Sequence, residues 1–167
     1  MYGDMPYAIR PWLFTVLLAG SLVPARPQQD PDVLDAAGLR KLIEGLGYDV
    51  KDVTKTPGSE KYEFKITRQA MDVPISTKIS TSHNYVWFTV FLGPAPVDPA
   101  KNAQLLKLNY QDQPNNFYVT DGGNLMMGIA VDNRDVTAAI VQRVVEKLGD
   151  DVALSADVWG EAQTAPK

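Results

Sequence analysis

Apolar and polar residues alternate along three consecutive segments in the middle of the chain, which predicts three strands. One face of the segment 61–67 carries the apolar side chains Tyr62, Phe64 and Ile66. This alternation is typical of a half-buried strand, and the segment 73–79 repeats it. The segment 84–92 is apolar on both faces and rich in aromatic and β-branched residues, so we expect it at the centre of a sheet. The short connections between the three segments favour antiparallel pairing.

Three other segments repeat their apolar residues every three to four positions and predict helices, over about 32–46, 99–109 and 134–148. Asp30 and Asp98 each precede a proline, which is the pattern of a helix N-cap followed by proline in the first turn. Asn133 is the predicted N-cap of the third helix, and Gly149 is its predicted end.

Two further alternating segments, 116–121 and 125–131, flank Gly122 and Gly123 and predict a hairpin. The predicted element order is therefore α-β-β-β-α-β-β-α. We expect an α+β fold, a two-layer sandwich in which an antiparallel five-stranded sheet carries its helices mainly on one face.

This element order, the sequence LLKLN at 105–109 and the hairpin sequence FYVTDGGNLMMGIAV at 117–131 together resemble the type III secretion chaperone-like fold. Within that fold the chain is most similar to the bacterial YbjN-like group, whose members are often labelled sensory transduction regulators. The resemblance covers roughly 32–149. It implies a protein that, as a cytoplasmic dimer, holds an unfolded segment of another protein on hydrophobic surface patches, and it offers no catalytic residues.

The N-terminal region departs from those cytoplasmic chaperones because it has the pattern of a secretory signal. The apolar run 12–23 is about twelve residues long, whereas a membrane-spanning helix needs roughly 20. Arg10 precedes this run, and Val23-Pro24-Ala25 follows it as a plausible cleavage site. We therefore predict an exported protein, periplasmic or extracellular, without stable membrane insertion after cleavage. The alternative is a short N-terminal helix packed on the domain.

These patterns divide the chain into four parts: a signal peptide at 1–25, a disordered leader at 26–31, the α+β domain at 32–149 and a C-terminal tail at 150–167. The formal net charge is -4, and basic residues interleave with acidic ones, which disfavours nucleic-acid binding. Cysteine is absent from the sequence, which excludes disulfides, thiolate metal sites and cysteine nucleophiles.

Neither a cofactor nor a metal ion is expected, because no acidic spacing matches an EF-hand and Gly122-Gly123 lacks the context of a phosphate-binding loop. His83, the single histidine, lies in a polar stretch between two predicted strands, where a turn residue is the simpler interpretation. Ser82 stands beside it, but the sequence contains no Gly-x-Ser-x-Gly nucleophile elbow. We therefore predict no enzyme. A small-molecule sensor or small enzyme that uses His83 is the alternative hypothesis.

The aromatic residues of the segment 84–92 are the candidate binding residues, namely Tyr85, Trp87, Phe88 and Phe91. Aromatic side chains in strands usually belong to the core between sheet and helices. If helices cover only one face of the sheet, however, the second set of large side chains on this strand needs a partner. The leading hypothesis is thus an exported, non-catalytic, protein-binding or chaperone-like module. Its partner would be a protein, a peptide or a second copy in a homodimer, and a structural envelope protein is a further alternative.

Overall fold

The computed structural model describes residues 33–160, which lie in one compact unit of the chain. Along this range the elements follow one another as α1 (Ala36–Gly45), β1 (Lys51–Asp52), β2 (Tyr62–Arg68), β3 (Met71–Ile79), β4 (Tyr85–Pro94), α2 (Pro99–Gln111), β5 (Asn116–Val119), β6 (Asn124–Asp132), α3 (Ala138–Leu154) and α4 (Ala156–Gly160). The signal peptide and leader predicted for 1–31 lie outside the described residues. Within the described range, no helix is both long enough and apolar enough to cross a membrane.

All strands belong to one antiparallel sheet in the order β1-β2-β3-β4-β6-β5. The predicted α+β class is confirmed, but the prediction of five strands is wrong, because the described sheet has six. The additional strand, β1, has only two residues, both exposed. A strand this short shows no apolar alternation, so the sequence pattern could not indicate it.

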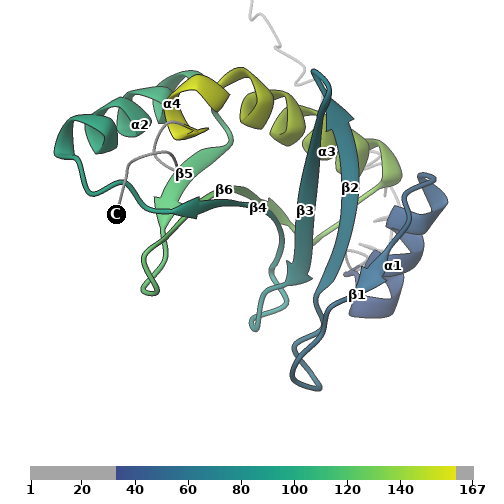
Figure 1. The fold of residues 1–167 in the computed structure, drawn as a ribbon. Helices are drawn as coiled ribbons and strands as arrows, with labels where there is room; N and C mark the ends of the chain where they lie inside the picture. The colour runs from purple at the N-terminus through teal and green to yellow at the C-terminus, as the bar shows by residue number, and fades with distance from the viewer. Residues whose placement is uncertain (1–32, 161–167) are drawn as a thin grey trace, which may run out of the picture. The chain divides into compact units, whose positions relative to one another are not determined.

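The helices α2, α3 and α4 lie on the same side of the sheet, and α1 lies beside β1 and β2 (Figure 1). The core fills the space between these layers, and α3 contributes most of its helical side chains. Its largest fully buried members include Phe64, Phe88, Leu39, Ile43, Ile75, Leu125, Met127 and Leu148. Every strand that the sequence predicted thus buries one of its faces against helices.

Two helix starts differ from the sequence predictions. In the structure α1 begins at Ala36, and its N-cap Asp35 accepts a hydrogen bond from the Gly38 amide at 2.6 Å. The third helix, α3, has Thr137 as its N-cap instead of Asn133. Asn133 is fully buried, and its side chain is engaged in tertiary hydrogen bonds. The predicted N-cap of α2, Asp98, is confirmed, since its carboxylate accepts from the Ala100 amide at 2.9 Å.

The predicted end of the third helix at Gly149 is also wrong, because α3 continues to Leu154 and α4 follows directly. Gly149 lies where α3 crosses β2, and a Cβ there would stand 2.2 Å from Cδ1 of Ile66. The glycine therefore permits close packing of helix on sheet and does not terminate the helix. Of the predicted tail, residues 150–154 are the last turn of α3, and α4 folds back on them, since Trp159 donates from Nε1 to the Val152 carbonyl at 2.8 Å.

The motif Leu105–Asn109 holds α2 against the outer edge of β5. Phe117 donates its main-chain amide to Oδ1 of Asn109 at 2.6 Å, and Nδ2 of Asn109 donates to the Phe117 carbonyl at 3.2 Å. The side-chain amide thus takes the place of a neighbouring strand at this position. Covering an edge in this way hinders unwanted pairing with other chains.

Candidate functional site

Strand β4 presents aromatic side chains on both faces of the sheet. Val86, Phe88 and Val90 alternate toward the helices and are almost fully buried. Tyr85, Trp87 and Phe91 therefore point to the opposite face, where Tyr85 is 46% and Phe91 57% exposed. Of the four residues that the sequence predicted as partner-binding, the structure brings these three together on one face.

The fourth predicted residue, Phe88, lies in the core instead. It is 0% exposed and pairs across the sheet with Thr77 of β3 and Ile129 of β6, on the helix-covered face. A partner on the outside of the sheet could not contact its ring. A strand that is apolar on both faces has no polar positions to mark the inward side, so the sequence pattern could not separate Phe88 from Phe91.

Side chains from β6 and β5 extend this surface. The register places Met126 opposite Phe91 and opposite Tyr118. Gly128 lies next to the Tyr118 ring: a Cβ on this glycine would lie 3.4 Å from Cε1 of the tyrosine, and closer, at 3.0 Å, to the Phe88 carbonyl oxygen. Burial raises the pKa of the Tyr118 phenol. We call the surface formed by Tyr85, Trp87, Phe91, Tyr118 and Met126 the open aromatic face.

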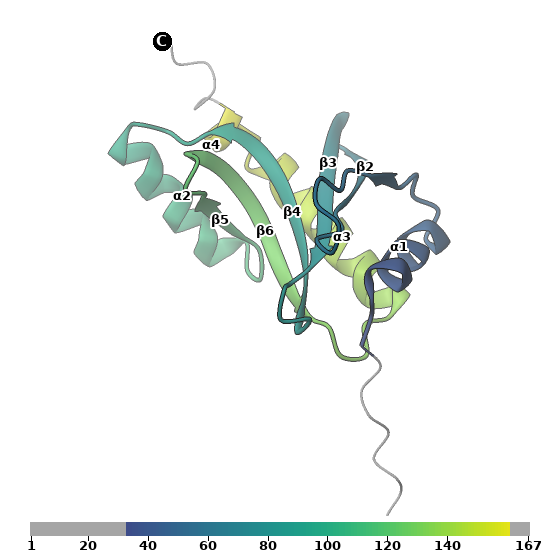
Figure 2. The ribbon, with the colours of Figure 1, turned by 90° about the horizontal axis from the view of Figure 1, so that it is seen from below.

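The open aromatic face covers only one half of the outer sheet surface. On the other half, β2 and β3 alternate so that Glu63, Lys65, Ser76 and Lys78 point away from the helices. Seen from below, β4 and β6 cross in front of α3, and no described helix covers them from this side (Figure 2). An apolar surface bordered by polar residues is typical of a protein interaction site.

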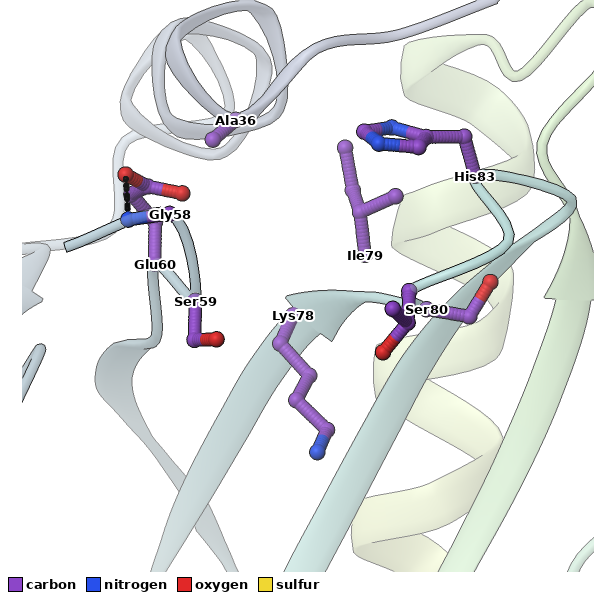
Figure 3. A pocket seen from close by; sticks show the side chains of 9 residues that line it. Ala36, Gly58, Ser59, Glu60, Lys78, Ile79, Ser80 and His83 are labelled. Atoms are coloured by element: carbon purple, nitrogen blue, oxygen red, sulfur yellow. Dashed lines mark hydrogen bonds between the residues drawn. The ribbon is translucent and has the colours of Figure 1, made fainter. Parts of the chain in front are cut away.

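His83, the residue of the alternative hypothesis, lies in the turn between β3 and β4. Its φ angle is 59°, and its amide donates to the Ser80 carbonyl at 2.8 Å. The imidazole borders a polar hollow of about 140 Å³ formed with residues from three segments (Figure 3), namely Ala36, Gly58, Ser59, Glu60, Lys78, Ile79, Ser80 and Thr81. This volume is below the roughly 300 Å³ at which small-molecule sites begin.

The polar groups around that hollow are not arranged as a catalytic set. Among the described residues, the His83 imidazole makes no hydrogen bond, and the Glu60 carboxylate instead accepts from the Gly58 amide at 3.1 Å. The Ser82 hydroxyl lies 3.1 Å from the hydroxyl of Ser80. Over the described part of the chain, no cluster of His, Asp or Glu side chains could hold a metal ion. The role of His83 that the structure does show is in its main chain, where the carbonyl accepts from Nδ2 of Asn133 at 2.9 Å.

A second polar cluster, which the sequence did not indicate, is buried between α3 and the connection from α2 to β5. The carboxylate of Asp151, 6% exposed, accepts from Lys147 at 2.6 Å and from Nδ2 of Asn115 at 2.6 Å. Burial, and then the charge of Asp151, raise the pKa of Asp112, which the Lys147 ammonium lowers in part. Asp151 and Asn115 are buried, whereas Lys147 is 40% exposed and Asp112 is half-buried. The cluster joins α3 to the connection before β5, so we assign it to the stability of the fold.

Comparison with known proteins gives structural likeness alone. No protein-family model and no curated protein sequence matches the chain. A chain of the heterodimeric complex ExoU-SpcU, from the type III secretion system of Pseudomonas aeruginosa, is similar with a TM-score of 0.51 and 14% identity, over 71% of this chain and 94% of that one. The Yersinia pestis type III secretion chaperone SycH, solved in complex with a stable fragment of YscM2, gives a TM-score of 0.46 and 11% identity, over 70% and 94% of the two chains.

The predicted likeness to type III secretion chaperones is therefore confirmed at the level of the fold. At 14% identity, this likeness concerns the fold alone. The narrower resemblance to the YbjN-like group stays a prediction from the motif at 105–109 and the hairpin at 117–131.

Proposed function

We propose that the chain is a chaperone-like module that binds another protein through the open aromatic face. The observation that carries this proposal is the alternation of β4, which buries Phe88 beneath the sheet and leaves Tyr85 and Phe91 about half exposed above it. Burying a large apolar side chain contributes about 1.5–3 kcal/mol, so a partner that covers several of them gains substantial affinity.

The chemistry of the described residues supports binding over catalysis. The open aromatic face has large side chains of low conformational entropy, which are enriched at binding hot spots. Its polar border, with Lys78 opposite Trp87 in the register, provides the charged rim that such interfaces have. The partner is a protein or a peptide, and a homodimer that buries this face between two copies is the special case.

We also propose that the protein is exported, on the strength of the charged, apolar and small-residue pattern at 1–25. Expression of the full chain in its native host, followed by intact mass measurement in each cell fraction, tests this directly. A mature form that begins near Arg26 outside the cytoplasm is the expected result. A full-length mass found only in the cytoplasm would contradict export without affecting the binding proposal.

Site-specific crosslinking tests the binding proposal. A photo-reactive amino acid replaces Trp87 in one version of the full chain and Lys65, on the polar half of the same sheet surface, in a matched control. In the native host we expect a discrete crosslinked product from position 87 and none from position 65. The mass of the product distinguishes a second copy from a different protein.

A second test of the binding proposal is the double variant Trp87→Ser/Phe91→Ser, which removes two apolar side chains of the open aromatic face and leaves the core residues unchanged. It should abolish the crosslink from a reporter placed at Tyr85 while the circular dichroism spectrum stays unchanged. Equal crosslinking at positions 87 and 65, or a monomer that binds no apolar dye at this surface, would refute the proposal.

A further inference from the structure

The sheet contains an open seam between β3 and β4. Their register runs from Ile79 and Val86 to Ser76 and Thr89 and ends there, although β3 extends back to Met71 and β4 forward to Pro94. With increasing distance from the hairpin that connects them, β3 and β4 diverge (Figure 1). The seam is formed by residues 71–75 on one side and 90–94 on the other.

Pro74 explains why the pairing ends at this point. Ser80 donates to the Tyr85 carbonyl at 2.8 Å, so Ser80 and Tyr85 form a hydrogen-bonded pair. Every second residue of β3 before Ser80 therefore also directs its main-chain N–H and C=O toward β4. Hydrogen-bonded pairs recur every second residue, so the pair after Ser76 and Thr89 would join Pro74 to Phe91. Proline has no N–H to donate. Toward β2, Pro74 is paired with Lys65, at a position of the ladder where no N–H is required. The pairing of β2 with β3 therefore continues past Pro74 to Met71.

A hollow of about 350 Å³ lies in the seam. It is lined from both strands and from the helix layer by Met71, Asp72, Val73, Pro74, Val90, Phe91, Leu92, Val152 and Trp159. Val152 and Trp159 belong to the helix layer, and the hydrogen bond from the indole to the Val152 carbonyl holds that ring in place. Phe91 belongs both to this hollow and to the open aromatic face.

We propose that this seam binds one extended peptide segment of the partner, with an apolar side chain in the hollow and a basic residue next to it. The inference rests on the proposed protein-binding function and names the chemistry of the segment that is bound. The peptide would pair with β4 along the main chain of Phe91 and would complete the sheet between β3 and β4.

Three features of the seam select this occupant. The alternation of hydrogen-bonded pairs directs the N–H and C=O of Phe91 toward β3, where Pro74 supplies no N–H. The main chain of an extended peptide can pair with these two groups of Phe91. The hollow is lined by apolar side chains and has room for a large one. Asp72 is the one charged residue among its lining residues and lies exposed at the rim, which favours a cationic neighbour for the anchor.

Binding is measured by fluorescence anisotropy of labelled nine-residue peptides added to the full chain. The first probe consists of Thr and Val with a central Leu and one Lys beside it. A second probe replaces the Lys by Glu, and a third replaces the Leu by Ser. Two further probes carry an N-methyl group on alternate sides of the extended main chain. We expect at least tenfold weaker binding of the Glu and Ser probes and of one N-methyl probe, but not of the other.

The decisive variant is Pro74→Val, which restores the missing N–H and lets β3 pair with β4. We expect it to slow amide hydrogen exchange at Phe91 and to weaken binding of the first probe at least tenfold. The matched control is Pro96→Val, in the connector after β4, which should leave binding unchanged. If Pro74→Val fails to fold, Trp159→Ala replaces it, because the enlarged hollow should then prefer a Trp-anchored probe to the Leu-anchored one.

The outcomes separate this inference from the proposed function. Loss of probe binding in Pro74→Val while the Trp87 crosslink persists supports the seam as a distinct peptide site. Three results would overturn the inference: no probe binds the wild-type chain, both N-methyl probes bind equally, or Pro74→Val still binds the first probe. In each case the crosslink still reports on the open aromatic face. If the chain with the photo-reactive residue at position 87 gives no crosslink while the wild-type chain binds the first probe, the proposed function alone is overturned.

Discussion

Gly149 of α3 lies directly against Ile66 of β2, and a Cβ on the glycine would stand 2.2 Å from the Ile66 Cδ1 atom. The contact limits how far apart α3 and the sheet lie. It also explains why a glycine stands inside a helix whose other residues bury a broad apolar stripe.

Gly149→Ala should destabilise the fold. The overpacking cost of about 1–3 kcal/mol should exceed the roughly 1 kcal/mol by which alanine favours a helix interior over glycine. Urea unfolding measures the change, and Gly45→Ala is the matched control, because its Cβ would meet nothing within 4 Å. Adding Ile66→Val removes the clashing Cδ1 atom, so Gly149→Ala should cost less in that background. An equal cost in both backgrounds would contradict the contact.

Phe88 and Phe91 test the assignment of the two faces of β4. Phe88→Ala should lower the free energy of unfolding by about 3–5 kcal/mol, because its ring is fully buried in the core. Phe91→Ala should cost less than about 1 kcal/mol, since the ring is 57% exposed in the free chain. Thermal unfolding of the two variants in parallel measures the loss of stability at each position. Similar losses at both positions would mean that the faces are wrongly assigned.

Asn133 should be essential for joining the β3–β4 turn to the segment before α1. Its Nδ2 donates to the Leu34 carbonyl at 3.0 Å and to the His83 carbonyl at 2.9 Å, and the side chain is fully buried. Asn133→Leu leaves both carbonyls without this donor, which should cost about 1–3 kcal/mol for each group that stays unsatisfied. Hydrogen exchange of the first turn of α1 should accelerate. Asn116→Ala, at an exposed strand position, is the control and should change little.

The pH dependence of stability should carry a contribution from Asp112. Its pKa is raised by burial and by the nearby Asp151 carboxylate, so the folded state binds more protons than the unfolded state above pH 3.8. In the window between 3.8 and the folded pKa, this residue makes stability fall as pH rises. Asp112→Asn should therefore increase stability at pH 7, by up to about 1 kcal/mol for a partly exposed group.

Urea midpoints of the wild type and of Asp112→Asn, measured from pH 3 to pH 7, test that contribution. The difference between the two proteins should grow as pH rises and should vanish at the acidic end. A difference that does not depend on pH would assign the effect to packing and not to the charge of Asp112.

The element order followed from the sequence because its signals are local. Alternation along β2 and β3, the Asp98 cap of α2 and the glycine turn before β6 each depend on residues only a few positions apart. The strand β1 escaped prediction for the same reason, since two exposed residues carry no period. The end of α3 was misplaced because Gly149 signals a helix stop locally, whereas its role lies in its contact with Ile66.

The candidate binding surfaces were decided only by the tertiary structure. The sequence alone determined that β4 carries aromatic residues on both faces, but the register with β3 and β6 determined that Phe88 is buried and Phe91 is exposed. Pro74 likewise reads locally as one residue of a strand. Its effect depends on which neighbouring strand its missing N–H faces, and that is a property of pairing between distant segments, which no local pattern contains.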